Sequence, residues 1–395
     1  MSGLLTNAIR SATTVNYDFP QLYGFGGATK SARKVNIQSS LTVSAFYTGI
    51  NTLANSIGIL PFIVQTSTND ERQPQVNHPA YKLLLNRPNE YMSAFSWKHL
   101  MTITMLLKGD SYSQIERNGS GNIVNINYLP YDEVTVIDFN AKLFYRYKGQ
   151  VLESDDVIHF KGFSFDGKTS KSVLEFAADS LGKTLNAQQY SSDALDDSGL
   201  SYGVIETEKT MKPESKESLA NAFENRLQKK SKHRSPVLDE GMKYKRITLT
   251  PDETKFIETY ANGIEDVARW LNMPRHKLHI EGEGGYNALI QMEQDYLQSA
   301  VLPLTTKLKE ELDYKLFSQR EKRQGYNVYQ NHKKLLQVDP KSRAEFYKQL
   351  FFMKSITPNE IRKLEDMNPT NDGDKTYQLS NVLTQDQFEK TLEDE

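Results

Sequence analysis

Apolar side chains recur at helical spacing in two long segments of the second half of the chain. One runs over residues 250–273 after a Thr-Pro-Asp-Glu start, which is typical of a capped helix N-terminus. The other runs over residues 286–317 and holds Pro303, where we expect a kink. Residues 274–285, between them, contain three glycines and alternating charges, and they continue neither helix. The pattern predicts a helix, a specially shaped loop and a second helix.

The first half of the chain changes its period along its length. Residues 43–60 form a helical stripe that Pro61 ends, and the segment after Asp110 alternates with a period of two. The strands expected there are residues 111–116, 123–129, 133–137, 143–147 and 157–161. Short strands joined by tight turns favour an antiparallel sheet over repeated βαβ units. The predicted fold class is therefore α+β.

A small α/β insertion is expected at residues 200–249, between two long helices. The first of these helices begins at Ser172 with a Ser-Val-Leu-Glu capping box. The insertion carries a local basic patch on a chain whose net charge is only −2. Its cations are Arg226, Lys229, Lys230, Lys232, Arg234, Lys243, Lys245 and Arg246. The C-terminal tail has the opposite sign, because acids outnumber bases after Ser355.

Composition narrows the class of protein. A length of 395 residues favours two or three compact units, and 38% hydrophobic with 25% charged residues is in the globular range. The chain has no cysteine, which removes disulfides and thiolate metal sites and fits an intracellular origin. No run approaches 18 apolar residues, so no membrane span is expected. The near-neutral charge gives no global field for nucleic acid, so contact with DNA would be local or weak.

Residues Gly162–Thr169 satisfy the Walker A pattern and follow an expected strand. A nucleotide-binding loop would use Lys168 for the phosphates and Thr169 for Mg²⁺. Three observations oppose it: two phenylalanines lie in the cradle, Asp166 adds negative charge, and the preceding strands are expected to be antiparallel. A tight strand-to-helix turn with Lys168 in solvent is the favoured interpretation. A P-loop NTPase of a packaging motor stays as the alternative, and a scaffold without a channel as a third.

The sequence holds no other pattern that indicates catalysis. A metal-binding His-Glu-x-x-His motif, a Gly-x-Ser-x-Gly nucleophile elbow and paired catalytic acids are all missing. His276 and His279 lack the further ligands that a closed metal site needs. We therefore expect a protein that is not an enzyme and that needs no metal or cofactor.

An ordered series of short blocks over about Val43 to Gly373 resembles the portal proteins of tailed bacteriophages, in the siphophage-type family. The blocks are Leu60-Pro61, His78-Pro79, Arg87-Pro88-Asn89, Leu107 to Tyr112, Asp156 to Gly162, Ser164 to Gly167, Ile264 to Arg269, Asn272-Met273-Pro274, Tyr286-Asn287, Leu302-Pro303, and Leu336, Asp339, Arg343, Thr357, Asn359, Glu360 and Arg362. Two positions depart from the family pattern: the glycine usual after Asp166-Gly167 is replaced near Ser170, and Asp110 stands where asparagine is common.

The resemblance implies a domain order for the chain. It implies a flexible N-terminal arm (1–38), a wing with an antiparallel sheet (39–171), stem helix 1 (172–199), a clip (200–249), stem helix 2 (250–273), a tunnel loop (274–285), a wing and tunnel helix (286–330), a helical crown (331–375) and an acidic tail (376–395).

The resemblance also implies a ring, usually dodecameric, at one capsid vertex of a virion assembled in the host cytoplasm. Double-stranded DNA would pass through it in packaging and ejection, without sequence-specific contacts. Its partners would be the terminase large subunit, a head-to-tail adaptor, and the major capsid and scaffold proteins. We expect the tunnel-loop residues His276, Lys277, His279, Glu281 and Glu283 to face the channel, and the basic clip patch to contact a partner or DNA.

Overall fold

The computed structural model describes residues 35–68, 71–196, 203–207, 212–218, 221, 242–246, 251–279, 286–332, 340–365 and 367–375. The chain divides into two compact units between Asn331 and His332, one residue after the boundary expected between wing and crown. Most of the expected arm and all of the tail at 376–395 lie outside the described residues. Helix α2 (Ile37–Ser40) already begins inside the expected arm, because Asn36 and Ser39 form a capping box.

Two packed helices, α3 (Ser44–Ile59) and α5 (Ala94–Lys108), lie at the centre of the first unit. The apolar stripe of α3 is buried, and the helix ends at Leu60 because the residue before a proline avoids the helical region. On α5, Trp97 is fully buried and donates its Nε1–H to Ser113 Oγ at 2.9 Å. The short helix α4 (Pro79–Leu85) precedes α5. The predicted helix over 43–60 is therefore present, and its stripe forms part of the core.

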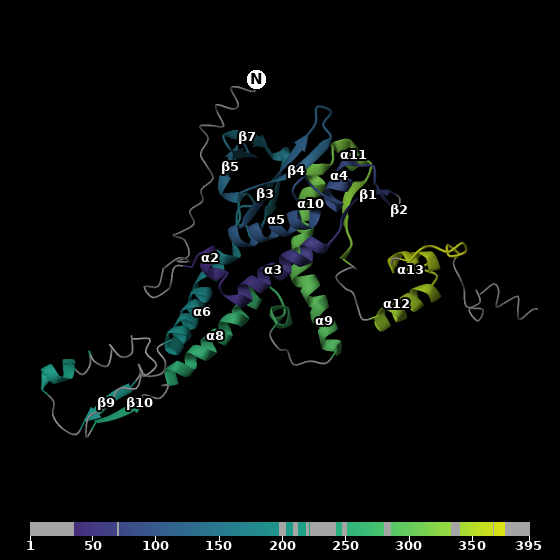
Figure 1. Ribbon diagram of the computed structural model, residues 1–395. Helices are drawn as coiled ribbons and strands as arrows, with labels where there is room; N and C mark the ends of the chain where they lie inside the picture. The colour runs from purple at the N-terminus through teal and green to yellow at the C-terminus, as the bar shows by residue number, and fades with distance from the viewer. Residues whose placement is uncertain are drawn as a thin grey trace, which may run out of the picture. The chain divides into compact units, whose positions relative to one another are not determined.

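Three small antiparallel sheets complete the body of this unit (Figure 1). Their strand orders are β11 (Tyr326–Gln330)–β1 (Phe62–Thr68)–β2 (Glu71–Pro74), β4 (Ile123–Leu129)–β3 (Asp110–Arg117)–β8 (Val157–Lys161), and β5 (Val134–Phe139)–β6 (Lys142–Tyr147)–β7 (Gln150–Glu153). Two 3₁₀ turns, η1 (Tyr131–Glu133) and η2 (Ser154–Asp156), join strands. The α+β class and the antiparallel pairing are confirmed, although the strands between Asp110 and Lys161 form two sheets and not one.

Two long helices, α6 (Val173–Asp196) and α8 (Pro251–Trp270), lie side by side (Figure 1). The predicted capping box is present, because Ser172 Oγ accepts from the Glu175 backbone N–H at 3.0 Å. The helices approach so closely that a Cβ atom added at Gly263 of α8 would lie 2.0 Å from Thr184 Oγ1 of α6. A two-stranded antiparallel ribbon, β9 (Gly203–Thr207) with β10 (Met242–Arg246), stands between them in the sequence.

The chain after α8 contains a 3₁₀ turn η3 (Arg275–Leu278), α9 (Tyr286–Tyr296), a π-helical turn η4 (Leu297–Val301) and α10 (Leu302–Leu316). The irregularity expected at Pro303 lies just before it, in η4, and the proline itself stands in the first turn of α10. The charged residues 319–323 form the helix α11 (Gln319–Arg323), because Ser318 and Glu321 make a capping box.

The described residues of the second unit form two helices, α12 (Pro340–Phe352) and α13 (Pro358–Leu364). Thr357 caps α13 in a box with Glu360. Arg343 of α12 pairs with Glu365 at 3.0 Å, which joins the two helices. Within the part of the chain that the structure describes, no helix has the length and apolar character required to cross a membrane.

Candidate functional site

The turn η3, at the start of the expected tunnel loop, is bonded to α9, the helix that follows the loop. Oε1 of Glu293, on α9, lies 2.9 Å from His276 Nε2 and 2.7 Å from Lys277 Nζ. Burial acts to raise the pKa of Glu293, but the hydrogen bonds from Lys277 and His276 prevail and lower this pKa below its ordinary value. His279 ends η3 in the left-handed region, with φ of 57°, and its side chain is exposed. His276 and Lys277 are thus engaged with α9, whereas His279 is open to solvent.

This contact extends into the core of the first unit. The Lys277 ammonium lies 4.9 Å from the centre of the Tyr296 ring, and the Tyr296 hydroxyl lies 2.8 Å from Ser56 Oγ on α3. Leu278 is buried beside Gly49 of α3, where an added Cβ atom would lie 3.2 Å from Leu278 Cδ2. The turn η3 is therefore held on one side by α9 and on the other by α3.

Pro303 leaves one backbone carbonyl open within the π-helical turn. Proline has no N–H, so the carbonyl of Ser299, four residues earlier, lacks its α-helical donor. The side-chain amide of Asn272 donates to that carbonyl at 2.7 Å instead. Asn272 lies just after α8 and has φ of 50°, a conformation that asparagine tolerates. The end of α8 is in this way hydrogen-bonded to the α9–α10 helix, and the loop between them starts and finishes at fixed points.

The basic clip patch is described in part. Lys243, Lys245 and Arg246 lie on β10, where Lys243 is exposed and stands opposite Glu206 of β9 in the antiparallel register. Arg226, Lys229, Lys230, Lys232 and Arg234 lie outside the described residues, as do the tunnel-loop residues Glu281 and Glu283.

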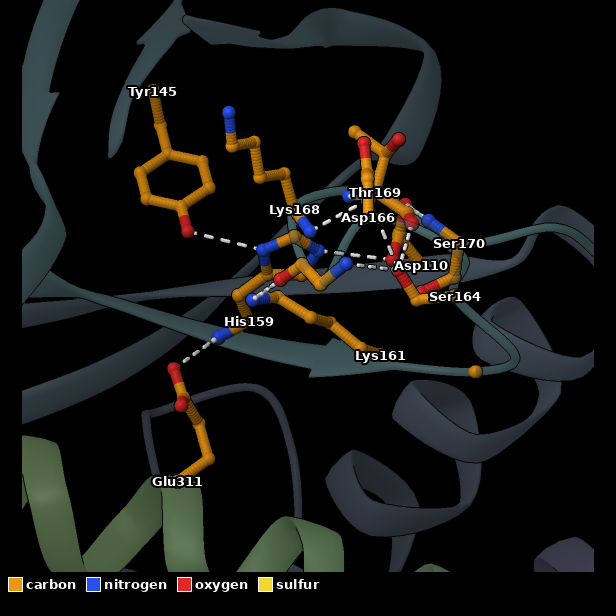
Figure 2. Close-up of polar contacts among 12 residues, drawn as sticks. Asp110, Tyr145, His159, Lys161, Ser164, Asp166, Lys168, Thr169, Ser170 and Glu311 are labelled. Carbon is orange, nitrogen blue, oxygen red and sulfur yellow. Dashed lines mark hydrogen bonds and ion pairs between the residues drawn. The ribbon is translucent and has the colours of Figure 1, made fainter. Parts of the chain in front are cut away.

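The loop with the Walker A pattern is filled by its own side chain (Figure 2). Oδ1 of Asp166 accepts hydrogen bonds from the backbone N–H groups of Lys168, at 2.7 Å, and Thr169, at 3.0 Å. These are the donors that a phosphate would need, and a carboxylate on them repels a second anion. Lys168 pairs with Asp138 of β5, and its side chain remains 38% exposed to solvent. The preceding strand β8 is antiparallel to β3, and the loop is a strand-to-helix turn.

A buried polar cluster joins this turn to the sheet (Figure 2). His159 lies with Nε2 3.0 Å from Asp110 Oδ1 and with Nδ1 3.0 Å from the Tyr145 hydroxyl. The other Asp110 oxygen accepts the Ser170 N–H at 2.9 Å, and Glu311 of α10 accepts the His159 N–H at 3.1 Å.

Burial lowers the pKa of His159 and raises the pKa of Tyr145, so both side chains are neutral at pH 7. A serine, a histidine and an aspartate come together here, but Asp110 and His159 are each 2% exposed and no substrate reaches them. The cluster is a structural joint between the sheet, α10 and the start of α6.

The sequence did not indicate Glu293 or the Asp110–His159 pair as important positions. Glu293 is 16 residues from Lys277, and no spacing rule connects a carboxylate on a helix with cations beyond a loop. Asp110 had a weak signal, because it departs from the asparagine common in the portal family. Its role became visible only with the burial of His159 against it.

The structure combines an α+β body with a close helix pair, a small ribbon between these helices in the sequence, and a turn bonded to α9 after them. This arrangement matches a known family of proteins. The family model for phage portal proteins matches residues 44–366. The chain therefore belongs to the phage portal protein family. It is 24% identical over 349 residues to the portal protein of Enterobacteria phage HK97, covering 86% of this chain and 82% of that one. It is 25% identical over 378 residues to a probable portal protein of Streptomyces phage phiC31, covering 90% and 81%.

Solved structures share the fold. The crystal structure of an HK97-family phage portal protein from Corynebacterium diphtheriae superposes with a TM-score of 0.57 at 14% identity, over 76% of this chain and 96% of that one. A chain in the neck of an empty gene transfer agent particle, computed with C6 symmetry, gives 0.57 at 21% identity, over 87% and 98%. A chain in the neck of the native particle, computed with C12 symmetry, gives 0.54 at 20% identity with the same coverage.

Proposed function

We propose that this chain is the subunit of a portal ring, usually dodecameric, through which double-stranded DNA enters and leaves a capsid at one vertex. The observation that carries the proposal is the α6–α8 pair, which bears the β9–β10 ribbon between its helices and η3 with α9 after it. In a portal subunit the α6–α8 pair would be the stem, the β9–β10 ribbon would belong to the clip, and η3 with α9 would form the base of the tunnel loop. The C6 and C12 symmetry of the similar neck structures supports a homo-oligomeric ring.

The charge around the loop suits a channel in which DNA slides. Each phosphate contact adds free energy through counterion release, and a ring repeats that contact in every subunit. Glu293 forms an ion pair with Lys277 and offsets its positive charge, so the base of the loop would not present a strongly basic ring to DNA. We assign His276, Lys277, His279, Glu281 and Glu283 to the channel on this ground. We assign the clip patch to docking of the terminase motor, the head-to-tail adaptor or incoming DNA.

A portal subunit needs no catalytic centre, and we propose that the chain is not an enzyme. In the described residues no group of three or more His, Cys, Asp or Glu side chains is placed to hold a metal ion. The alternative of a P-loop NTPase predicts Mg²⁺-dependent ATP hydrolysis that Lys168→Ala abolishes. The filled N–H cradle predicts no hydrolysis by the purified protein, with or without that substitution.

The assembly is tested by negative-stain imaging of the purified protein with light scattering on the same sample. Rings with a central hole wide enough for duplex DNA support the proposal, and a monomer that also fails to form rings with scaffold protein contradicts it. The loop is tested separately by deleting residues 279–285. Rings should form, while heads package or retain less DNA. Undiminished yields of full, stable heads would contradict the assignment of residues 279–285 to the tunnel loop.

A further inference from the structure

We infer that Glu293 is the positioning residue that sets the base of the tunnel loop. Its consequence for DNA rests on the proposed function, whereas the contact itself does not. One oxygen of Glu293, Oε1, contacts both His276 Nε2 and Lys277 Nζ, which belong to adjacent residues of η3. Two consecutive side chains bonded to one atom leave η3 little freedom to rotate about its own axis. Glu293 therefore fixes the direction in which the chain leaves Leu278.

The contact is only partly screened from water. The side chains of His276 and Lys277 are 17% and 23% exposed, whereas that of Glu293 is 41% exposed, so water weakens each ion pair and the geometry of two contacts to one atom carries the inference. Lys277 also lies over the Tyr296 ring, one helical turn after Glu293. The ring position is fixed in turn by Ser56 on α3.

The position of Glu293 along α9 decides what it can transmit. It lies three residues before Tyr296 and the π-helical turn η4, where the helix is held by Asn272 through the Ser299 carbonyl. π-Helical turns interrupt the regular ladder and are frequent at functional sites. A displacement of α9 about η4 would carry Glu293 with it, and Glu293 would carry η3. Glu293 therefore couples the loop base to α9, while Leu278 and Tyr296 tie both to α3.

The test is hydrogen exchange of the assembled protein, read on peptides that cover residues 275–279. Glu293→Gln keeps the shape of the side chain and one acceptor but removes its charge. We expect exchange in these residues to rise about fivefold, as the loss of about 1 kcal/mol of local stability implies. High salt should raise exchange in the wild type and leave the variant unchanged. The double variant Lys277→Glu with Glu293→Lys should return exchange toward the wild-type rate.

Asp295→Asn is the matched control. Asp295 is on the same helix and carries the same charge, but its described hydrogen bond is to Gln291 of α9. It should leave exchange in residues 275–279 unchanged. Equal exchange in the wild type and Glu293→Gln would overturn the inference, as would an equal rise in both single variants.

Heads assembled with Glu293→Gln separate this inference from the proposed function. Raised exchange together with reduced DNA retention supports both. Raised exchange with full retention keeps the positioning role of Glu293 and counts against the tunnel-loop assignment. Unchanged exchange, with the 279–285 deletion still impairing retention, removes the positioning role and leaves the loop assignment in place.

Discussion

The contact between α6 and α8 predicts that Gly263→Ala destabilises the protein. A Cβ atom at position 263 would lie 2.0 Å from Thr184 Oγ1 and 3.0 Å from Thr184 Cβ. Rotation about χ1 of Thr184 moves its oxygen and methyl group but leaves its Cβ in place. An ordinary contact needs 3.4 Å or more, so the two helices must separate locally.

The expected magnitude follows from two opposing effects. Overpacking of this kind costs about 1–3 kcal/mol. Replacing glycine by alanine inside a helix contributes about 0.5–1 kcal/mol in the opposite direction. We therefore expect a net loss of about 1–2 kcal/mol in the free energy of unfolding. On an open helix surface the same substitution would stabilise the protein.

A double-mutant cycle with Thr184→Ala isolates the contact. Thr184→Ala removes the two atoms that rotate and leaves a contact of 3.0 Å, so the double variant should recover about 1 kcal/mol relative to the sum of the single variants. Urea unfolding followed by tryptophan fluorescence measures it. Trp270 of α8 donates to Ser180 Oγ of α6 at 3.0 Å, so it reports on the same helix pair. A more stable Gly263→Ala, or additive effects, would refute close packing at this crossing.

Three further predictions concern other parts of the first unit. Burial lowers the pKa of Lys98 from 10.5 to about 8, so between these pH values the unfolded chain binds a proton that the folded protein releases, and the free energy of unfolding rises with pH. Relative to Lys98→Met, the wild type should gain about 3 kcal/mol in this free energy from pH 8 to 10.5. Parallel pH curves for the two proteins would contradict this prediction. Gly109 has φ of 97°, and a Cβ atom there would lie 2.4 Å from the Ser170 carbonyl oxygen, so Gly109→Ala should cost about 3 kcal/mol in thermal unfolding. The control Gly149→Ala is also at positive φ but in open space, and it should cost about 1 kcal/mol. Equal costs for the two variants would argue against the contact at Gly109. Trp97→Phe leaves Ser113 Oγ without its donor and also leaves a cavity, so the hydrogen bond is isolated by a double-mutant cycle with Ser113→Ala, which should show a coupling of about 1 kcal/mol in urea unfolding followed by circular dichroism. Additive losses would argue against the hydrogen bond.

Features that depend on neighbouring residues could be predicted from the sequence. The Ser172 capping box, the end of α3 before Pro61 and the period-two strands after Asp110 all involve residues a few positions apart. The short helix α11 also has a local signal, because Ser318 and Glu321 have the spacing of a capping box.

Features that depend on tertiary contacts could not be predicted in this way. Nothing in the sequence pairs β1 with β11, since their register is set by packing and not by a turn. The loop at residues 162–169 is similar. Its pattern alone fits a phosphate site, and only the direction of the Asp166 carboxylate shows that its N–H groups are already taken.

The pairing of β1 with β11 has a consequence for how the protein is made. Gln65 of β1 hydrogen-bonds to Asn327 of β11, 262 positions later in the chain. That sheet cannot close until the ribosome has delivered almost the whole first unit. Contacts of such long sequence separation are slow to form, because the entropy of closing the loop is lost before the contact stabilises anything. One edge of β1 therefore stays unpaired during synthesis until residues 326–330 have been made, which exposes its N–H and C=O groups to other chains.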